Sequence, residues 1–380
     1  MSTLKVSKVE PVTTGGDCIV KATNIVGNKN LVINGAMQVA QRGTSSTSSG
    51  FYTLDRFQFL FSGHNEALTQ AQHALTSSDT GPWAKGFRNS YHITNGNQTG
   101  GADAADYAII RHNVEAQDIA NSGWDYTSSS SYITLSFWVK SSVAQNFYGN
   151  IITSDGTAQN YPYETGSLSA NTWTKIIKTI PGNSNITVDN NNGSGFQIDI
   201  WPFGGTTYTA SPTLNTWAAY ASGTRMPNNT STWWTTNDST FEITGVQLEV
   251  GDVATGYEHK SYHDDLMRCF RYFYKADGYN SHAMISRSST AIGATVNTPV
   301  PMRASPTAGA GNWCRVMKST TTDDYGDSST GSFAVGGSTP SVTVTGSMVF
   351  LQYGSMSNVT NTGNTDYGYL TNPIEFEAEL

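Results

Sequence analysis

The sequence carries little charge. Lys, Arg, Asp and Glu make up only 13% of its 380 residues, about half the ~25% that is typical of soluble domains. Uncharged polar groups must therefore cover much of the surface. Tracts of Ser, Thr, Asn and Gly at 45–50, 127–131 and 189–195 supply such groups. This composition is typical of a β protein with short strands and many loops.

Clusters of basic residues are also lacking. The formal net charge is −8 and the sequence pI is about 5.3. Lys and Arg occur singly along the chain, whereas binding to nucleic-acid phosphates needs them in groups. We therefore expect no nucleic-acid partner.

Cysteine and long apolar runs are scarce. Cys18, Cys269 and Cys314 are far apart, odd in number and without CxxC spacing, which indicates neither a disulfide framework nor a zinc site. We expect synthesis in a reducing cytoplasm. The N-terminus lacks a secretion signal, and no run of about 18 apolar residues could span a bilayer, so we expect no membrane insertion.

The usual motifs of enzymes are missing too. There is neither a GxSxG motif nor a GxxxxGK[ST] loop, which serve acyl transfer and phosphate binding. Enzymes that cleave glycans use paired carboxylates, and Asp155, Glu164 and Asp199 are candidates, but no pattern indicates which two would meet. We expect no catalytic residues, no cofactor and no enzymatic activity.

Two patterns could bind metal ions. His259 and His263 are four residues apart beside Asp264 and Asp265, a spacing that can bring two imidazoles to one metal on a helix. However, His259 stands at the end of a predicted strand and no HExxH motif is present. The acidic residues at 323–327 lack the spacing of a calcium loop. We interpret both patterns as surface features and predict no metal site.

Period-two alternation of apolar and polar residues dominates the chain. It is clearest at 132–140, where Ile133, Leu135, Phe137 and Val139 share one face. Similar segments lie at 57–61, 87–94, 107–114, 147–153, 173–181, 196–201 and 217–221, and again after residue 277 at 283–287, 291–297, 313–318, 332–335, 341–345, 348–353 and 374–380. Each segment has one face to bury. The pattern predicts an all-β protein, an antiparallel jelly-roll sandwich.

The segment at 241–259 adds detail to this prediction. Its apolar register shifts across Gly245, which is the pattern of a strand with a β-bulge. Residues 262–273 follow as the one plausible helix, with Leu266, Phe270 and Phe273 on one apolar stripe. In the final segment, Ile374 to Leu380 alternate with glutamates, so we expect the apolar side chains to face inward and the carboxylates to face water.

Four phrases connect these segments to a known family. They are NLVINGAMQVAQRG at 30–43, YTLDRF at 52–57, TGVQLEVGDVATGYEHKSYHDDLMRCFRYFY at 244–274, and the ending IEFEAEL at 374–380. In this order they resemble tail-fibre and other virion structural proteins of bacteriophages, which contain a jelly roll similar to a carbohydrate-binding module. The resemblance covers nearly the whole chain and is weak in the loops.

The resemblance implies a division into four parts. We expect a virion-attachment segment at 1–29, where Leu4, Val6 and Val9 have a spacing suited to docking, and a jelly-roll domain at 30–260. A helical connector at 261–276 and a smaller β domain at 277–380, the receptor-binding tip, would follow. Fibres of this kind are typically parallel homotrimers, and their location is the virion, here most simply the phage tail.

Exposed tryptophans suggest how such a protein would bind. Trp233 and Trp234 stand in a polar stretch, while Trp124 and Trp201 fall at strand ends or at polar strand positions. Flat indoles stack well on sugar rings, so we take these four as candidate contacts to host cell-surface polysaccharide. The alternative is that they cap the sandwich core or fill a subunit interface. Two other functions stay open: a head fibre or capsid decoration protein, and a tail spike that cleaves glycans.

Overall fold

The computed structural model describes residues 29–276, 281–288, 291–308, 314–317, 332–334, 341–353, 367–370 and 374–380. The expected attachment residues Leu4, Val6 and Val9 lie outside these ranges, as does the acidic segment at 323–327. None of the helices in the described part is long and apolar enough to cross a membrane.

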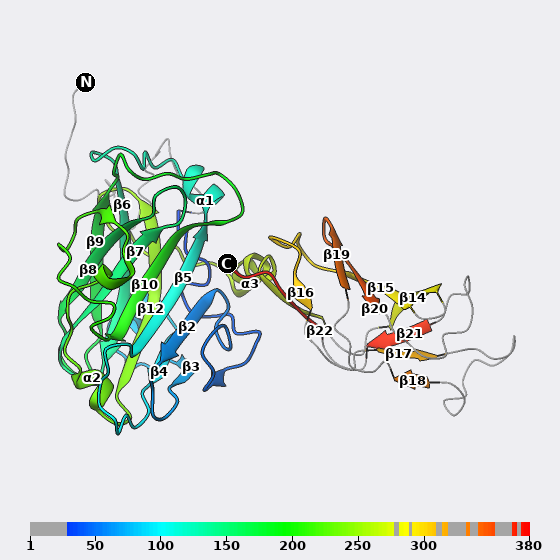
Figure 1. The fold of residues 1–380 in the computed structure, drawn as a ribbon, viewed down its shortest axis with the longest axis horizontal. Helices are drawn as coiled ribbons and strands as arrows, with labels where there is room; N and C mark the ends of the chain where they lie inside the picture. The colour runs from blue at the N-terminus through cyan, green and yellow to red at the C-terminus, as the bar shows by residue number, and fades with distance from the viewer. Residues whose placement is uncertain are drawn as a thin grey trace, which may run out of the picture.

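Two six-stranded antiparallel sheets form a sandwich (Figure 1). The first sheet has the order β1-β3-β4-β12-β6-β9, with β1 at Ser45–Ser46, β3 at Thr69–Ala74, β4 at Asn89–Thr94, β12 at Thr240–Val250, β6 at Tyr132–Ser141 and β9 at Thr174–Pro181. The second has the order β11-β8-β7-β10-β5-β2, with β11 at Ala218–Ala219, β8 at Gln159–Ser167, β7 at Asn146–Thr153, β10 at Ser194–Gly204, β5 at Tyr107–Glu115 and β2 at Phe57–Ser62. The all-β sandwich prediction is confirmed.

The core lies between these sheets because alternation gives every strand one apolar face. On β6, Leu135 and Phe137 are fully buried and contact the same cluster as Phe196 and Ile198 of β10. Across the chain the cluster joins apolar residues from both sheets. Burial of this kind contributes roughly 25 cal/mol per Å² of apolar surface.

The predicted bulge is present in β12. Its pairing with β6 shifts register between Thr244 and Gln247, and Gly245 has the left-handed φ of +65°. The shift keeps Ile243 and Val246 both in the core, because the extra residue changes which side chains point inward. Val246 then donates its N–H to the carbonyl of Gly35 at 2.9 Å, which attaches the start of the domain to its last strand.

Short helices complete this domain. They are the 3-10 turns η1 at Trp83–Lys85 and η2 at Ser222–Thr224, and the helices α1 at Ala116–Ala120 and α2 at Thr232–Thr235. The longer α3 spans Tyr262–Phe270 and begins at Ser261, whose hydroxyl accepts a hydrogen bond from the N–H of Asp264 at 3.1 Å, a common N-cap.

The expected apolar stripe of α3 is only partly correct. The buried helix residues are Asp265 and Cys269, and Leu266 packs beside Cys269. Phe273 lies beyond the helix, on strand β13 at Phe273–Ala276. The helix ends three residues early because the chain is extended there and pairs with the final strand.

A small sheet and a larger one follow. The small sheet has the order β13-β22-β16, with β22 at Ile374–Glu377 and β16 at Thr307–Ala308. The larger, seven-stranded sheet has the order β18-β17-β21-β14-β15-β20-β19, with β18 at Ser332–Ala334, β17 at Cys314–Met317, β21 at Tyr367–Leu370, β14 at Ser281–Ser288, β15 at Ala291–Asn297, β20 at Met348–Tyr353 and β19 at Ser341–Thr345. The domain boundaries drawn from the sequence stay a prediction.

The end of the chain returns to the sandwich. Figure 1 places the C-terminus beside α3, and the side-chain amide of Asn113 of β5 donates to the backbone oxygen of Leu380 at 2.9 Å. Phe376 and Ala378 are buried as expected. The expectation that the carboxylates of this segment face water is wrong for Glu379, because its side chain is only 5% exposed and lies against Arg42 and Arg56.

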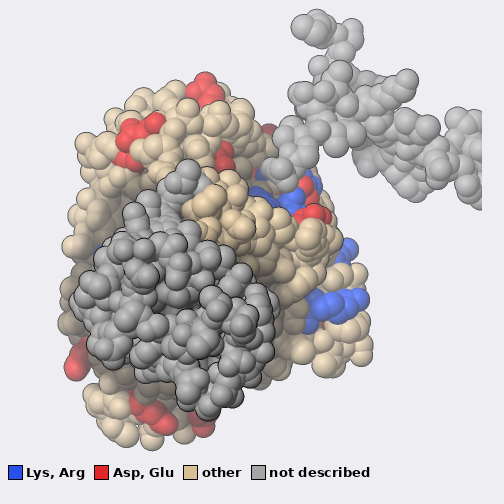
Figure 2. Space-filling model, turned by 90° about the vertical axis from the view of Figure 1, so that its right-hand side faces the viewer, with Lys and Arg blue, Asp and Glu red and all other residues tan. Residues whose placement is uncertain are grey.

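Most of the visible described surface is uncharged. Figure 2 shows small separate groups of acidic and basic residues among neutral ones on the described part of the face that it presents. This agrees with the low charge of the sequence.

Candidate functional site

The four tryptophans proposed from the sequence are not exposed. Trp233, Trp234 and Trp201 have no exposed area, and Trp124 is 3% exposed. The prediction that they offer open indole faces to a sugar is therefore wrong, and the alternative, that they cap the core, describes three of them.

The short helix α2 explains two of the buried indoles. It turns Trp233 and Trp234 toward the core, and each indole N–H donates to a backbone carbonyl: Trp233 to Thr240 and Trp234 to Gly101, both at 3.0 Å. Trp234 also stacks on Phe203 at 5.1 Å between ring centroids. Each indole ring is packed and each indole N–H is hydrogen-bonded within the protein. These two residues therefore close one end of the sandwich.

Trp201 lies elsewhere, on the outer face of the second sheet. Its indole N–H donates to Oδ1 of Asn150 at 2.7 Å, and it packs with Ile109 of β5 and Met226. The chain segment 205–226 covers it, so this strand face is not open to water at Trp201. Residues that are more exposed pack around the buried Trp201 ring.

Half-buried aromatic side chains surround Trp201. Tyr107, Tyr148 and Tyr208 pack against the Trp201 cluster, and Tyr220 lies close by, since the guanidinium of Arg225 is 5.5 Å from its ring centroid. All four tyrosines are partly exposed. We name these four tyrosines, together with Gln58, Arg111 and Gln197, the tyrosine platform.

Strand pairing brings the polar members of the tyrosine platform into line. Gln58 of β2 pairs with Arg111 of β5, and Arg111 pairs with Asp199 of β10. Side chains at paired positions share a face of the sheet. Gln58, Arg111 and Gln197 are partly exposed there, so amide and guanidinium donors stand next to aromatic rings.

A buried carboxylate holds the central arginine. Asp199 is fully buried and accepts two hydrogen bonds from Arg111, at 2.8 and 2.9 Å, and a third from Gln197 at 2.9 Å. Burial alone would lower the pKa of Arg111, but the attraction of Asp199 raises it above the usual value. The bidentate pair fixes the guanidinium plane.

The segment 205–226 is itself fastened to the sheet. Asn160 of β8 donates to the carbonyls of Thr224 and Arg225 at 3.2 and 3.1 Å, and Arg225 donates its N–H to the carbonyl of Tyr208 at 3.0 Å. The Arg225 guanidinium also faces the rings of Trp201 and Tyr208 at 5.7 and 5.4 Å. Tyr208 is thus held in place in the free protein, so a ligand that binds there would cost little conformational entropy.

The three candidate catalytic carboxylates have separate partners. Asp199 holds Arg111 as described, Glu164 accepts from Asn146 at 2.7 Å, and Asp155 accepts from the N–H of Asp189 at 2.9 Å. The platform therefore offers aromatic and hydrogen-bonding groups, with Asp199 acting as support.

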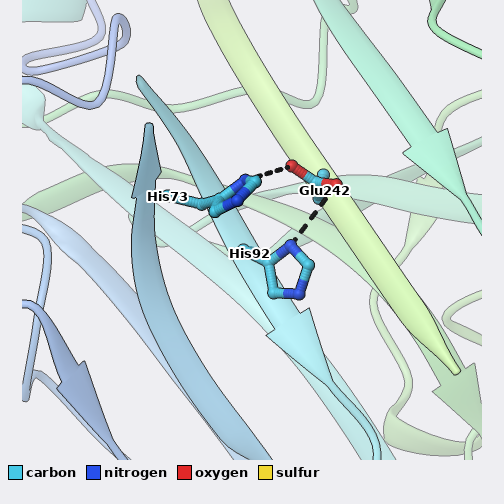
Figure 3. A group of neighbouring side chains, drawn as sticks. All are labelled: His73, His92 and Glu242. Atoms are coloured by element: carbon cyan, nitrogen blue, oxygen red, sulfur yellow. Dashed lines mark hydrogen bonds and ion pairs between the residues drawn. The ribbon is translucent and has the colours of Figure 1, made fainter. Parts of the chain in front are cut away.

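The proposed histidine pair is divided between two environments. The ring of His259 lies against Phe87 and Tyr257, and its Nε2 is 2.8 Å from the carbonyl of Lys85. His263 is exposed in the first turn of α3. Among the described residues, the group of His and carboxylate side chains that does converge is His73, His92 and Glu242 (Figure 3).

Sequence reasoning missed this group and the tyrosine platform. Both are made by residues that pair across strands far apart in the chain, such as Glu242 with His92. The available signal was that His92 and Glu242 occupy polar positions of predicted strands. His73, in contrast, lies on β3, which the alternation does not predict.

A cavity of about 460 Å³ lies at a third place. Its lining includes Leu31 and Ile33 near the start of the domain, Asp118 of α1, and Arg268 and Tyr272 at the end of α3. It is thus at the junction of the sandwich with the connector and is separate from the tyrosine platform.

Comparisons with known proteins give weak similarities. No family model and no curated protein matches the chain. Among solved structures, the enzymatically active domain of bacteriophage CBA120 tailspike protein 4 matches over 59% of this chain with 11% identity and a TM-score of 0.32. The match spans only 22% of that tailspike chain.

Carbohydrate-binding modules also match. The N-terminal cellulose-binding domain of Cellulomonas fimi β-1,4-glucanase C matches over 57% of this chain and 99% of its own, with 8% identity and a TM-score of 0.27. The family 11 module of Clostridium thermocellum, solved with a mixed-linked tetrasaccharide, matches over 56% and 98%, with 12% identity and a TM-score of 0.25. Scores this low carry no functional argument, and the sandwich assignment rests on the strand pairing itself.

Proposed function

We propose that the chain is a non-enzymatic adhesion protein of a bacteriophage virion, a tail fibre that binds host surface glycans through the tyrosine platform. The observation that carries the proposal is the platform itself. It gathers Tyr107 and Tyr148 of the sheet with Tyr208 and Tyr220 of the covering segment, all partly exposed, on the face that carries Gln58, Arg111 and Gln197. Sugar rings stack on aromatic faces through their C–H groups, while their hydroxyls need amide and guanidinium partners.

The virion assignment is supported by the four phrases of the sequence that resemble phage fibre proteins. A tail location and a parallel homotrimer follow from the same resemblance. Three chains per fibre would multiply a weak contact at each platform, because linked sites raise the effective concentration for one another. The expected readouts are a trimeric mass in light scattering and labelled protein on the tails of intact particles.

Binding is tested with the full chain on an array of bacterial surface polysaccharides and on host cells. Replacing Tyr107 or Gln58 with Ala should weaken glycan binding roughly tenfold per chain, equivalent to about 1.4 kcal/mol. Tyr132→Ala is the matched control, since Tyr132 is an exposed tyrosine of the other sheet. Equal binding by all three variants would refute the platform as the binding site, and release of reducing ends from the polysaccharide would refute the non-enzymatic assignment.

A further inference from the structure

The outer face of the first sheet carries the group of three potential metal ligands. His73 lies on β3, His92 on β4 and Glu242 on β12, three neighbouring strands. His92 is directly opposite Glu242, and His73 is directly opposite Ser90. Figure 3 shows the two imidazoles turned toward the carboxylate. Because paired positions share a face, the sheet itself brings the three side chains together.

The two distances from the imidazoles to the carboxylate match those between ligands of one ion. Nδ1 of His73 lies 3.3 Å from Oε2 of Glu242, and Nδ1 of His92 lies 3.3 Å from Oε1. Zinc binds nitrogen and oxygen ligands at about 2.0–2.2 Å, so two ligands at tetrahedral positions are roughly 3.3–3.5 Å apart. The candidate ligand atoms of all three residues lie within 4.8 Å of one another.

Neighbouring side chains orient two of these three residues. Nε2 of His92 lies 3.1 Å from the hydroxyl of Thr94, which orients the ring and leaves Nδ1 toward the carboxylate. Nδ1 of His92 is buried and, despite its proximity to Glu242, has no partner at hydrogen-bonding geometry. Ser90 donates to Oε2 of Glu242 at 2.7 Å. Metal-binding histidines and carboxylates usually have such outer partners.

The carboxylate and the solvent exposure of this group suit a bound cation. Glu242 is 3% exposed, and its carboxylate oxygens, the anionic ligand atoms of the group, lie beside both imidazoles. The side chain of His73 is 50% exposed, so an ion can enter from solvent and keep an open position for water.

One neighbouring group opposes a cation. The ammonium of Lys140 on β6 lies 2.8 Å from Oε1 of Glu242 and 3.1 Å from Oδ1 of Asp79. When Glu242 turns to an ion, Lys140 retains Asp79 as its partner. Repulsion between the ammonium and the ion lowers the affinity, which makes Lys140 a useful second test.

We propose that His73, His92 and Glu242 form a binding site for a divalent transition-metal ion of the zinc class, on the sheet opposite the tyrosine platform. The site is independent of glycan binding. Two imidazoles and one carboxylate are a common protein ligand set for zinc, with the fourth position left to water or an external ligand.

The test is calorimetric titration of Zn²⁺ into the full chain at pH 7.5, with Co²⁺ absorption as a report of coordination geometry. We expect one ion per chain. His73→Gln should weaken binding at least roughly tenfold, and the side chain that it changes is 50% exposed. His263→Gln is the control, since His263 is an exposed histidine outside the group. Lys140→Met should strengthen binding.

The outcomes separate clearly. Loss of binding in His73→Gln with unchanged binding in His263→Gln supports the site. Failure of the unaltered chain to bind Zn²⁺, equal affinity of His73→Gln and the unaltered chain, or weaker binding by Lys140→Met would overturn it. In that case the three residues form only an ion-pair group on the sheet surface.

Discussion

Arg56 and Glu379, 323 positions apart in the chain, form an ion pair inside the protein. The side chain of Arg56 is 1% exposed, its guanidinium lies 3.5 Å from the ring centroid of Tyr272, and it donates to the carbonyl of Asn113 at 2.6 Å. Burial would lower its pKa, but Glu379 raises it above the usual value. The last residues of the chain are therefore part of the sandwich.

The first prediction concerns this pair. Glu379→Gln should lower the free energy of unfolding by about 3 kcal/mol, because removal of one partner leaves a buried charge without compensation. Glu375→Gln is the matched control: its pair with Lys275 is solvent-exposed, and its loss should cost less than about 1 kcal/mol. Urea unfolding of both variants measures the difference. Equal stabilities would show that the C-terminus does not contribute to the sandwich.

Much of the fold could be predicted from alternation, and the strands that it missed show its limit. β3 and β8 are absent from the prediction, as are the short strands β1, β13, β16 and β21. In β3 the inward positions are Gln70 and Gln72, whose amides donate to backbone carbonyls, including those of Ser48 and Met37. A strand whose buried face is polar has no apolar period, so periodicity alone cannot find it.

The candidate sites were less predictable than the strands. Whether Trp233 stacks on a sugar or fills the core depends on how α2 closes the sandwich, and local polarity does not determine this. The tyrosine platform requires Tyr208, from a loop, to lie beside Tyr107 of β5, with ring centroids 5.4 Å apart. Such neighbours are set by tertiary packing, which a single sequence does not display.

The second prediction tests the bulge of β12. Gly245 has a φ of +65°, and a Cβ added there would lie 2.5 Å from Cζ of Phe87. Gly245→Ala should therefore lower the free energy of unfolding by about 1 kcal/mol because of the left-handed backbone. Overpacking against the Phe87 ring should lower it by roughly 1–3 kcal/mol more. Thermal unfolding would measure the loss.

A second glycine separates these two effects. Gly166 also has a positive φ, +75°, but a Cβ there would meet no atom within 4 Å. Gly166→Ala should lose only the backbone contribution, about 1 kcal/mol. If both variants were equally stable, contact with Phe87 would not be what requires glycine at the bulge.

The third prediction concerns a buried histidine of the core. His112 is 2% exposed, neither ring nitrogen has a partner at full hydrogen-bonding geometry, and its ring centroid is 4.9 Å from that of Phe57. Burial, followed by repulsion from Arg56, lowers its pKa well below the usual range. The folded protein thus keeps His112 neutral under conditions where the unfolded chain binds a proton.

This difference in protonation sets the sign of the pH dependence of stability and the pH range in which it appears. Above the unfolded pKa of about 6.5, His112 is neutral in both the folded and the unfolded state, and the full stability of the protein is present. As the pH falls below that value, the unfolded state takes up a proton at His112 and the folded protein loses stability. His112→Phe should remove this loss between pH 7.5 and 5 and, by removing buried nitrogens without partners, raise stability by about 1 kcal/mol at pH 7.5. His263→Gln, a change at an exposed histidine, is the control variant. Urea unfolding at the two pH values decides, and an equal slope in His112→Phe and the unaltered chain would mean that other groups cause the acid sensitivity.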